Sequence, residues 1–152
     1  MRVFRVAPRE LSTSPLDGEG SFRYGGRWSS RGTRMAYTST TPELARLEHA
    51  VHIPYARVAV ALVFAVAELP DDLVERLPDK DLPPDWDAVP SAHATAAIGD
   101  AWISSTRGLA LAVPSALIPR SLTSERNILI NPAHPAFARI RVRIVAFRHD
   151  PR

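Results

Sequence analysis

The 152 residues, 45% hydrophobic and 23% charged, have the composition of a folded protein and a length that suits one compact domain over residues 1–152. The net charge of +3 comes mainly from arginines spread along the chain without a dense run. Charge alone therefore does not separate a nucleic-acid partner from a phosphate-containing small molecule or an acidic protein. The chain has no cysteine, which excludes disulfides, thiolate nucleophiles and cysteine-based zinc sites.

The sequence also predicts a cytoplasmic protein without a membrane span. Arginines interrupt the first ten residues, so they lack the continuous apolar segment of a signal peptide. The longest apolar run, residues 58–67, is about half as long as the roughly 20 residues that a membrane-spanning helix needs. The lack of cysteine fits a reducing compartment.

The first third of the chain predicts two short strands, a long loop and a helix. The strands are expected over residues 1–6 and 35–39, and the glycine-, serine- and arginine-rich stretch between them reads as a loop. The helix is expected from Pro42 to about Ile53, with Thr40 and Glu43 spaced as in a capping box. Its predicted apolar stripe consists of Leu44, Leu47 and Val51. Glu48 falls beside that stripe, so its carboxylate should lie at the edge of the buried face.

The rest of the chain predicts four strands and a second helix. An apolar segment over residues 57–68 indicates a central strand covered on both faces, and residues 69–90 read as a surface connection rich in proline and aspartate. A helix is expected over residues 91–104. The remaining strands are expected over residues 109–113, 127–130 and 138–147.

The last predicted strand alternates arginine with isoleucine and valine. Its arginines are Arg139, Arg141 and Arg143, and its apolar residues are Ile140, Val142 and Ile144. This alternation favours a strand with one buried face and one charged face in solvent, and a stripe that binds phosphate is the alternative interpretation.

Several common motifs are absent. The sequence contains neither a GxGxxG nor a GxxxxGK[ST] motif, and no serine lies in a GxSxG setting. His49 and His52 follow Glu48 in an order that matches no standard zinc motif, so we expect no metal site.

Three separated segments combine residue types that suit a binding site. The first is Gly25–Trp28, in which two glycines precede Arg27 and a tryptophan. The second is the strand 36–39, which leads to Glu48. The third comprises residues 113–116 and 125–135. Each segment alone also fits a structural role, with the tryptophan as a core anchor, the glutamate in an ion pair and the prolines bounding a strand.

Taken in this order, the segments resemble the RES domain, the toxin half of bacterial RES–Xre toxin–antitoxin pairs. The most specific elements are Gly-Arg-Trp at 26–28 and Asn-x-Leu-x-Asn-Pro-x-His-Pro at 127–135. The Arg, Glu and Ser for which the family is named match Arg27, Glu48 and Ser115. The resemblance covers most of the chain. Ser29 stands where a small amide is expected, and residues 71–87 match nothing that we can assign.

The resemblance implies an α+β fold, in which central mixed β-sheets are flanked by helices in one domain similar to ADP-ribosyltransferase toxins. It implies NAD as substrate, without a cofactor or metal and with inorganic phosphate as a possible co-substrate. It also implies neutralisation by an Xre-type helix-turn-helix antitoxin that covers the active site in a higher-order complex. No direct contact with nucleic acid or membrane is expected.

Cleavage of NAD at the nicotinamide bond explains why these residue types suit the site. Nicotinamide leaves as a neutral molecule, so the main difficulty is the positive charge that develops on the ribose, and Glu48 is expected to stabilise it. Arg27 is expected to bind the pyrophosphate and to be the second catalytic residue. The predicted NAD-binding residues are Arg27, Tyr37, Ser39, Ser115 and Asn127. Ser115 fits orientation better than nucleophilic attack, and Asn127 could instead hold loops together behind the site.

Some alternatives stay open at this point. The acceptor could be water, inorganic phosphate or a protein side chain, which would make the protein a glycohydrolase, a phosphorylase or an ADP-ribosyltransferase. A reading from another class is a non-enzymatic basic domain that binds nucleic acid through Arg139, Arg141 and Arg143. A third is a catalytically silent structural partner of the antitoxin.

Overall fold

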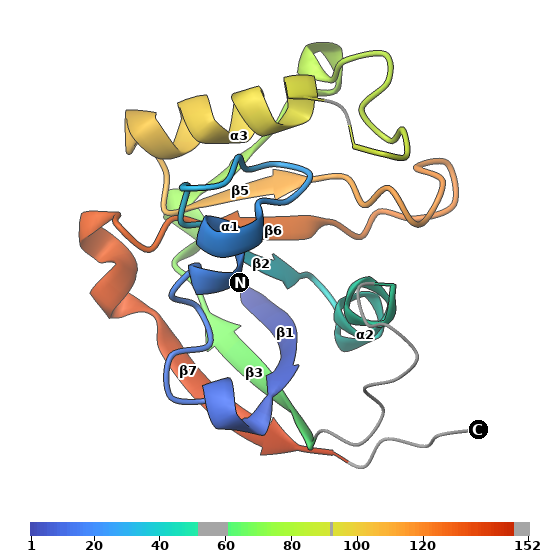
Figure 1. The fold of residues 1–152 in the computed structure, drawn as a ribbon. Coiled ribbons are helices and arrows are strands. Elements are labelled where there is room, and N and C mark those ends of the chain that lie inside the picture. Colours follow the sequence, from blue (N-terminus) through green and yellow to red (C-terminus); the bar gives the residue numbers. More distant parts are fainter. Residues whose placement is uncertain (52–60, 92, 148–152) are drawn as a thin grey trace.

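The computed structural model describes residues 1–51, 61–91 and 93–147, and these form a single domain around one β-sheet (Figure 1). The strands are β1 (Arg2–Pro8), β2 (Ala36–Ser39), β3 (Leu62–Glu68), β4 (Val74–Arg76), β5 (Ala110–Val113), β6 (Asn127–Ile130) and β7 (Arg141–Ala146). The helices are α1 (Glu19–Tyr24), α2 (Pro42–Ala50) and α3 (His93–Ser105). Short 3-10 helices cover Arg9–Leu11, Asp71–Leu73, Asp79–Asp81 and Pro135–Arg139.

The sheet is mixed, with the strand order β4-β5-β6-β2-β1-β3-β7. Strands β4 and β5 run parallel, and the other neighbouring pairs are antiparallel. Strands β1 and β2 meet at one registered pair, Phe4 and Ser39, whereas β1 and β3 pair over seven positions. The predicted α+β class is confirmed. More than one sheet is expected from the sequence, whereas the structure has one continuous sheet with a narrow junction between β2 and β1.

The two faces of the sheet carry different cores. Because side chains alternate along a strand, Tyr37 and Ser39 of β2 share one face with Asn127 and Leu129 of β6. This face packs against a cluster formed by Trp28, Met35, Leu77, Trp102, Leu111, Val113 and Leu129. The opposite face packs in a second cluster that contains Val3, Leu16, Ala36, Leu109, Ile128 and Ile130. Side chains on the first face can therefore meet α2 and α3 (Figure 1).

Helix α2 begins close to the predicted position, but with a different cap. The hydroxyl of Thr41 accepts a hydrogen bond from the Leu44 amide at 3.2 Å, whereas the Thr40 hydroxyl accepts one from the Arg126 amide at 3.0 Å. The predicted capping box is therefore wrong, because the Thr40 hydroxyl bonds to the residue before β6 and Thr41 caps the helix. Residues 52 and 53 of the predicted helix lie outside the described residues.

The predicted apolar stripe of α2 is only partly correct. Leu44 is buried, but Leu47 and Val51 are 40% and 53% exposed. The second buried residue of α2 is Ala45, which packs against β1 and β3. The helix thus contacts the sheet through a narrow face, and Glu48, one turn after Leu44, is half-buried beside it as predicted.

The remaining differences concern connections and the last strand. The predicted loop before β2 contains α1, and the predicted surface connection after β3 contains β4. Of the predicted strand 57–68, residues 57–60 lie outside the described residues. Strand β7 starts at Arg141 because a 3-10 helix occupies Pro135–Arg139. Its predicted buried face is wrong, since Val142 and Ile144 are 41% and 42% exposed at the sheet edge.

Helix α3 packs very closely on the loop before β2. A Cβ atom added to Gly99 would lie 1.7 Å from the carbonyl oxygen of Trp28, so only glycine fits at this crossing. The carboxylate of Asp100 accepts a hydrogen bond from the Ser30 amide at 3.1 Å. Both contacts fix the loop that carries Arg27. No helix in the described ranges combines the length and apolarity that crossing a membrane requires.

Candidate active site

Glu48 is the centre of a hydrogen-bond network built from three segments that are distant in sequence. Its Oε1 atom accepts hydrogen bonds from the Ser115 hydroxyl at 2.7 Å and from the Asn127 side-chain amide at 2.5 Å. Helix α2 supplies the carboxylate, the turn after β5 supplies Ser115, and β6 supplies Asn127. In the part of the chain that the structure describes, Oε2 receives no hydrogen bond. One oxygen is therefore fixed, and the other is left without a hydrogen bond by the described residues.

Ser39 sets the orientation of the Asn127 amide. Its hydroxyl donates to Oδ1 of Asn127 at 2.9 Å, which leaves the NH₂ group to donate to Glu48. Ser39, Ser115 and Asn127 are all buried. The network thus runs from strand β2 through strand β6 to helix α2, and two of its buried members, Ser115 and Asn127, donate to the carboxylate.

A second cluster surrounds the hydroxyl of Tyr37. This hydroxyl accepts a hydrogen bond from the Trp28 amide at 3.0 Å and shares another with the Ser29 hydroxyl at 2.9 Å. Burial raises the pKa of Tyr37 to about 12, although these hydrogen bonds and the nearby Arg27 charge act in the opposite direction. Gly26 is required beside this ring, because a Cβ atom there would lie 2.6 Å from the Tyr37 hydroxyl oxygen.

Arg27 is anchored by the segment that the sequence left unassigned. Its Nη1 atom donates to the carbonyl oxygens of Trp86 at 2.8 Å and Ala88 at 3.0 Å. Trp86 itself packs against the cluster that contains Trp28 and Trp102. Part of the 71–87 segment therefore positions Arg27. The Nε and Nη2 atoms of Arg27 form no hydrogen bond to any other described residue.

Strand β2 connects the two clusters. Tyr37 and Ser39 lie two residues apart on the same face, which corresponds to about 7 Å along a strand. The Arg5 guanidinium donates to the carbonyl oxygen of Tyr37 at 3.2 Å, and burial lowers the pKa of Arg5 although the charge of Asp17 opposes this shift. The structure thus brings four predicted site residues, Ser39, Glu48, Ser115 and Asn127, into one network. Tyr37 and Arg27 form an adjoining group, and no hydrogen bond between described residues joins Arg27 to Glu48.

Sequence reasoning missed the groups that position Arg27. The carbonyl oxygens of Trp86 and Ala88 are backbone atoms, so no residue type could have indicated them. The contact of Ser29 with Tyr37 was also missed. It involves the position where the sequence departs from the expected small amide, and a hydroxyl serves there as a hydrogen-bond partner.

The Asn-Pro-x-His-Pro segment is structural in this fold. Asn131 is fully buried, donates to the Ile103 carbonyl oxygen at 3.2 Å and accepts from the Ala133 amide at 3.0 Å. The Nδ1 atom of His134 accepts from the Ala136 amide at 3.1 Å and caps the following 3-10 helix. These residues shape the turn between β6 and β7.

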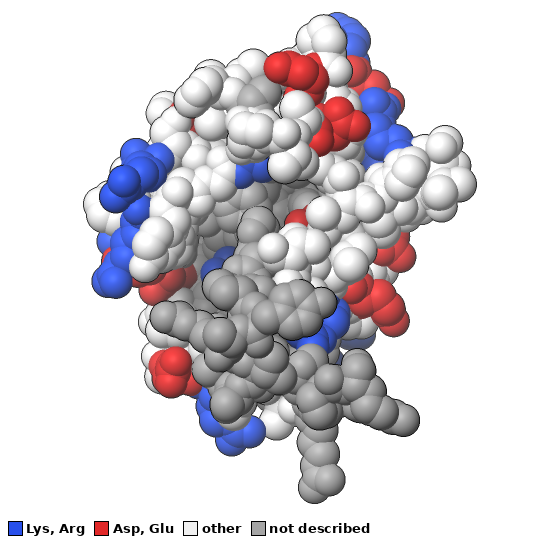
Figure 2. Space-filling view, turned by 45° about the vertical axis from the view of Figure 1, so that its right-hand side comes forward, with Lys and Arg blue, Asp and Glu red and all other residues white. Residues whose placement is uncertain are grey.

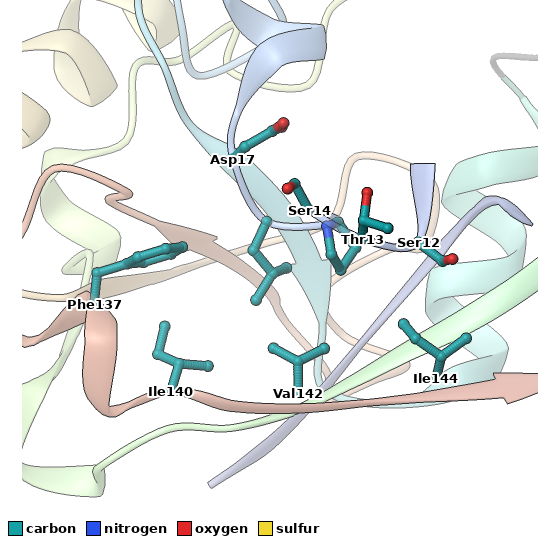
Figure 3. Close-up of a pocket in the computed structure, with 10 residues that line it drawn as sticks. Ser12, Thr13, Ser14, Asp17, Phe137, Ile140, Val142 and Ile144 are labelled. Carbon is teal, nitrogen blue, oxygen red and sulfur yellow. The ribbon is translucent and has the colours of Figure 1, made fainter. Parts of the chain in front are cut away.

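A pocket of about 350 Å³ lies away from this network. Its lining comprises Ser12, Thr13, Ser14, Pro15, Leu16, Asp17, Phe137, Ile140, Val142 and Ile144 (Figure 3). By strand alternation, Val142 and Ile144 face the side of the sheet opposite to Ser39 and Asn127. The pocket and the Glu48 network are therefore separate features.

The described surface around the site is mixed in charge. Among the described residues, no three His, Asp or Glu side chains gather in a metal-binding arrangement. Figure 2 shows a hollow at the level of β6 and β2, in which both basic and acidic side chains are visible, and elsewhere on this face the basic side chains are scattered. The fold and site together define a class, an α+β domain with a candidate active site built around an oriented carboxylate.

Comparison with known proteins identifies the family. The sequence matches the family model for the RES domain over residues 2–150. It is 33% identical to Toxin Res of Yersinia enterocolitica over 154 aligned residues, which cover 100% of this chain and 99% of that protein. It is 34% identical to the Prs ADP-ribosylating toxin of Sphingobium sp. over 148 residues, covering 95% and 89%, and 33% identical to Toxin Res of Pseudomonas putida over 140 residues, covering 90% and 91%. The chain belongs to the RES domain family, which includes these toxins.

Proposed function

We propose that this protein is a toxin that cleaves the N-glycosidic bond between nicotinamide and ribose in NAD. The observation that carries the proposal is the geometry of Glu48. Two buried donors, Ser115 and Asn127, hold Oε1 at 2.7 and 2.5 Å, while Oε2 has no hydrogen-bond partner among the described residues. A carboxylate that is oriented in advance, with one oxygen that the described residues leave unbonded, suits a reaction in which positive charge develops on a sugar.

The chemistry is balanced without a cofactor. The bond from C1′ of the ribose to the pyridinium nitrogen breaks, and its electron pair neutralises the pyridinium charge, so that nicotinamide leaves uncharged. The ribose becomes oxocarbenium-like, and the Glu48 carboxylate stabilises it electrostatically or through the ribose hydroxyls. An acceptor oxygen then bonds to C1′ and loses its proton to solvent.

Arg27 is proposed to bind the pyrophosphate. The carbonyl oxygens of Trp86 and Ala88 hold Nη1, and this contact directs the rest of the guanidinium. The remaining donors, on Nε and Nη2, have the planar geometry that matches two phosphate oxygens. In many nucleotide-binding folds a helix N-terminus binds the phosphates, and here Arg27 is proposed to do so instead.

The remaining predicted residues are proposed to position the Glu48 carboxylate and the substrate. Ser39, Ser115 and Asn127 are buried and bonded to one another or to Glu48, which favours orientation of the carboxylate over direct contact with NAD. Tyr37 has its hydroxyl engaged by Trp28 and Ser29, so the ring face is the part that it can offer to nicotinamide. Direct binding of NAD by these four side chains stays a prediction.

The acceptor distinguishes two candidate activities. Water or inorganic phosphate would give net degradation of NAD, which we favour. Transfer to a protein is the second candidate, because a relative that is 34% identical is named a Prs ADP-ribosylating toxin. We further propose that the protein acts in the cytoplasm and is neutralised by an antitoxin of the Xre helix-turn-helix type, a proposal supported by the toxin names of its relatives and by the sequence resemblance.

Product analysis tests this proposal. The purified chain is incubated with NAD alone, with NAD and inorganic phosphate, and with NAD and a bacterial cell extract, and the adenine-containing products are separated. We expect nicotinamide to be released together with ADP-ribose, a phosphorylated ADP-ribose or an ADP-ribosylated protein, which names the acceptor.

The test variant is Glu48→Gln, and the matched control is Glu43→Gln. Both replace a glutamate of α2 by glutamine, but Glu43 is exposed. Glu48→Gln should lower nicotinamide release at least roughly a hundredfold, because it removes the charge that stabilises the transition state. Glu43→Gln should retain wild-type activity. No nicotinamide release under any of the three conditions, or equal loss in both variants, would overturn the proposal.

A further inference from the structure

Strand β7 is an edge of the sheet that can accept another strand. It pairs with β3 along Arg141–Ala146, and no described residue pairs with its outer side. Its side chains are exposed along most of its length. The unpaired N–H and C=O groups of such an edge form a template to which an extended segment of another chain can add.

The two faces of β7 differ in chemistry. Val142 and Ile144 point to the side of the 350 Å³ pocket, where Phe137 and Ile140 continue the apolar row beneath residues 12–17 (Figure 3). By alternation, Arg141 and Arg143 point to the opposite side. A strand added to β7 would therefore meet an apolar row on one face and two positive charges on the other.

We propose that β7 is a docking edge for an extended segment of a partner protein in which acidic and apolar residues alternate. In such a pairing every second side chain of the segment lies beside Val142 and Ile144, and the intervening side chains lie beside Arg141 and Arg143. The apolar row of this surface lies on the sheet face opposite to the Glu48 network, and the two arginines lie on the same face as that network, with β1 and β3 between β7 and β2. The proposal does not depend on the proposed enzymatic function.

The charges on β7 select this occupant. No ion pair holds Arg141 or Arg143 within the described ranges, and Glu68, the acid opposite Arg141 on β3, is bonded by Arg2 at 2.9 Å. Two β7 strands from two copies, paired with their apolar rows aligned, would place arginine opposite arginine, which is unfavourable. A nucleic acid would use the arginines but neither the apolar row nor the backbone edge. An acidic and apolar peptide strand uses all three.

The test uses a short fluorescent peptide of alternating Glu and Val, with a Lys and Val peptide as the charge control. Two further versions carry N-methyl groups, on the Glu nitrogens in one and on the Val nitrogens in the other. Because all Glu amides of a strand point to one edge and all Val amides to the other, strand addition requires one version to lose binding and the other to keep it.

The protein variants are Arg141→Glu/Arg143→Glu and the matched Arg76→Glu/Arg107→Glu, whose arginines are exposed on β4 and after α3. Replacing two attractive cross-strand pairs by two repulsive ones should weaken binding of the Glu and Val peptide roughly tenfold or more. The matched variant should bind within about twofold of wild type, since its charge change lies far from β7. Circular dichroism spectra should show that both variants are folded.

Four results would overturn the proposal. They are no binding of the acidic peptide to the wild-type chain, equal binding of the two methylated versions, equal weakening in the two protein variants, and a dimer of the chain that dissociates in Arg141→Glu/Arg143→Glu. A single-stranded oligonucleotide is measured in parallel. If it binds through Arg141 and Arg143 while the peptide does not, the docking edge serves nucleic acid instead.

Discussion

At the scale of the residue, the chemistry of the site depends on how Asn127 is oriented. Its amide oxygen accepts from Ser39, and its amide nitrogen donates to Glu48. If the amide were flipped, a carbonyl oxygen would face a carboxylate oxygen, so Ser39 fixes the useful orientation. Helical periodicity predicted that Glu48 lies at the edge of a buried face. It could not predict the donors, because Ser115 and Asn127 are 67 and 79 residues away in sequence.

Tyr37 provides a prediction on pH dependence. Burial raises its pKa from the ordinary value of 10.0 to about 12, so the folded protein retains this proton more strongly than the unfolded chain does. The stability that comes from this difference is complete below pH 10.0 and is lost as the pH rises towards about 12. Ultraviolet absorbance of tyrosinate is recorded directly after jumps to a series of pH values. Plotted against pH, it should show a late ionisation step, near pH 12, that Tyr37→Phe removes.

The exposed Tyr24 supplies the control for this titration. Tyr24→Phe should leave the late step in place, because Tyr37 carries it. The assignment would be contradicted if the late step persisted in Tyr37→Phe or disappeared in Tyr24→Phe.

At the scale of the element, local signals predicted what local forces determine. Strand β6 and helix α3 occur close to where hydrophobic pattern and turn residues indicated them. The errors arose where tertiary packing decides. Strand β7 has the alternation of a half-buried strand, yet it lies at the edge of the sheet with most of its residues exposed, and sequence cannot reveal strand order. The edge strand β4 was missed because three residues carry too little periodicity.

The contact of α3 with the Arg27 loop gives a prediction on stability. Gly99→Ala should lower the free energy of unfolding by about 2 kcal/mol or more, because its methyl group would overlap the Trp28 carbonyl oxygen and push the helix away. It should also lower NAD cleavage, since the displaced loop carries Arg27. Urea denaturation and nicotinamide release measure the two effects.

Gly20→Ala is the matched control, because Gly20 also lies in a helix but has no atom within 4 Å of an added Cβ. This change should leave stability unchanged or raise it by about 0.5 kcal/mol through the higher helix propensity of alanine. Equal effects of the two substitutions on the free energy of unfolding would show that the close contact at Gly99 does not affect stability.

At the scale of the whole molecule, the site forms where the two parts of the sheet meet. Strand β2 joins β1 at a single registered pair, Phe4 and Ser39, and Ser39 is also the first member of the Glu48 network. Helix α2, which packs on β1 and β3, places Glu48 against β6 across this junction. The family resemblance predicted which residues gather there. It could not predict that residues 86 and 88 hold Arg27, since backbone carbonyl groups leave no signal in a sequence.

The central claim is that Glu48 acts on the transition state of NAD cleavage, and not on the binding of NAD. The most direct measurement compares the dissociation constant for NAD and the single-turnover rate of nicotinamide release in wild type and Glu48→Gln. We expect Glu48→Gln to bind NAD within a few fold of the wild-type affinity and to release nicotinamide at a rate at least roughly a hundredfold lower. A Glu48→Gln variant that cleaves NAD at nearly the wild-type rate would contradict it.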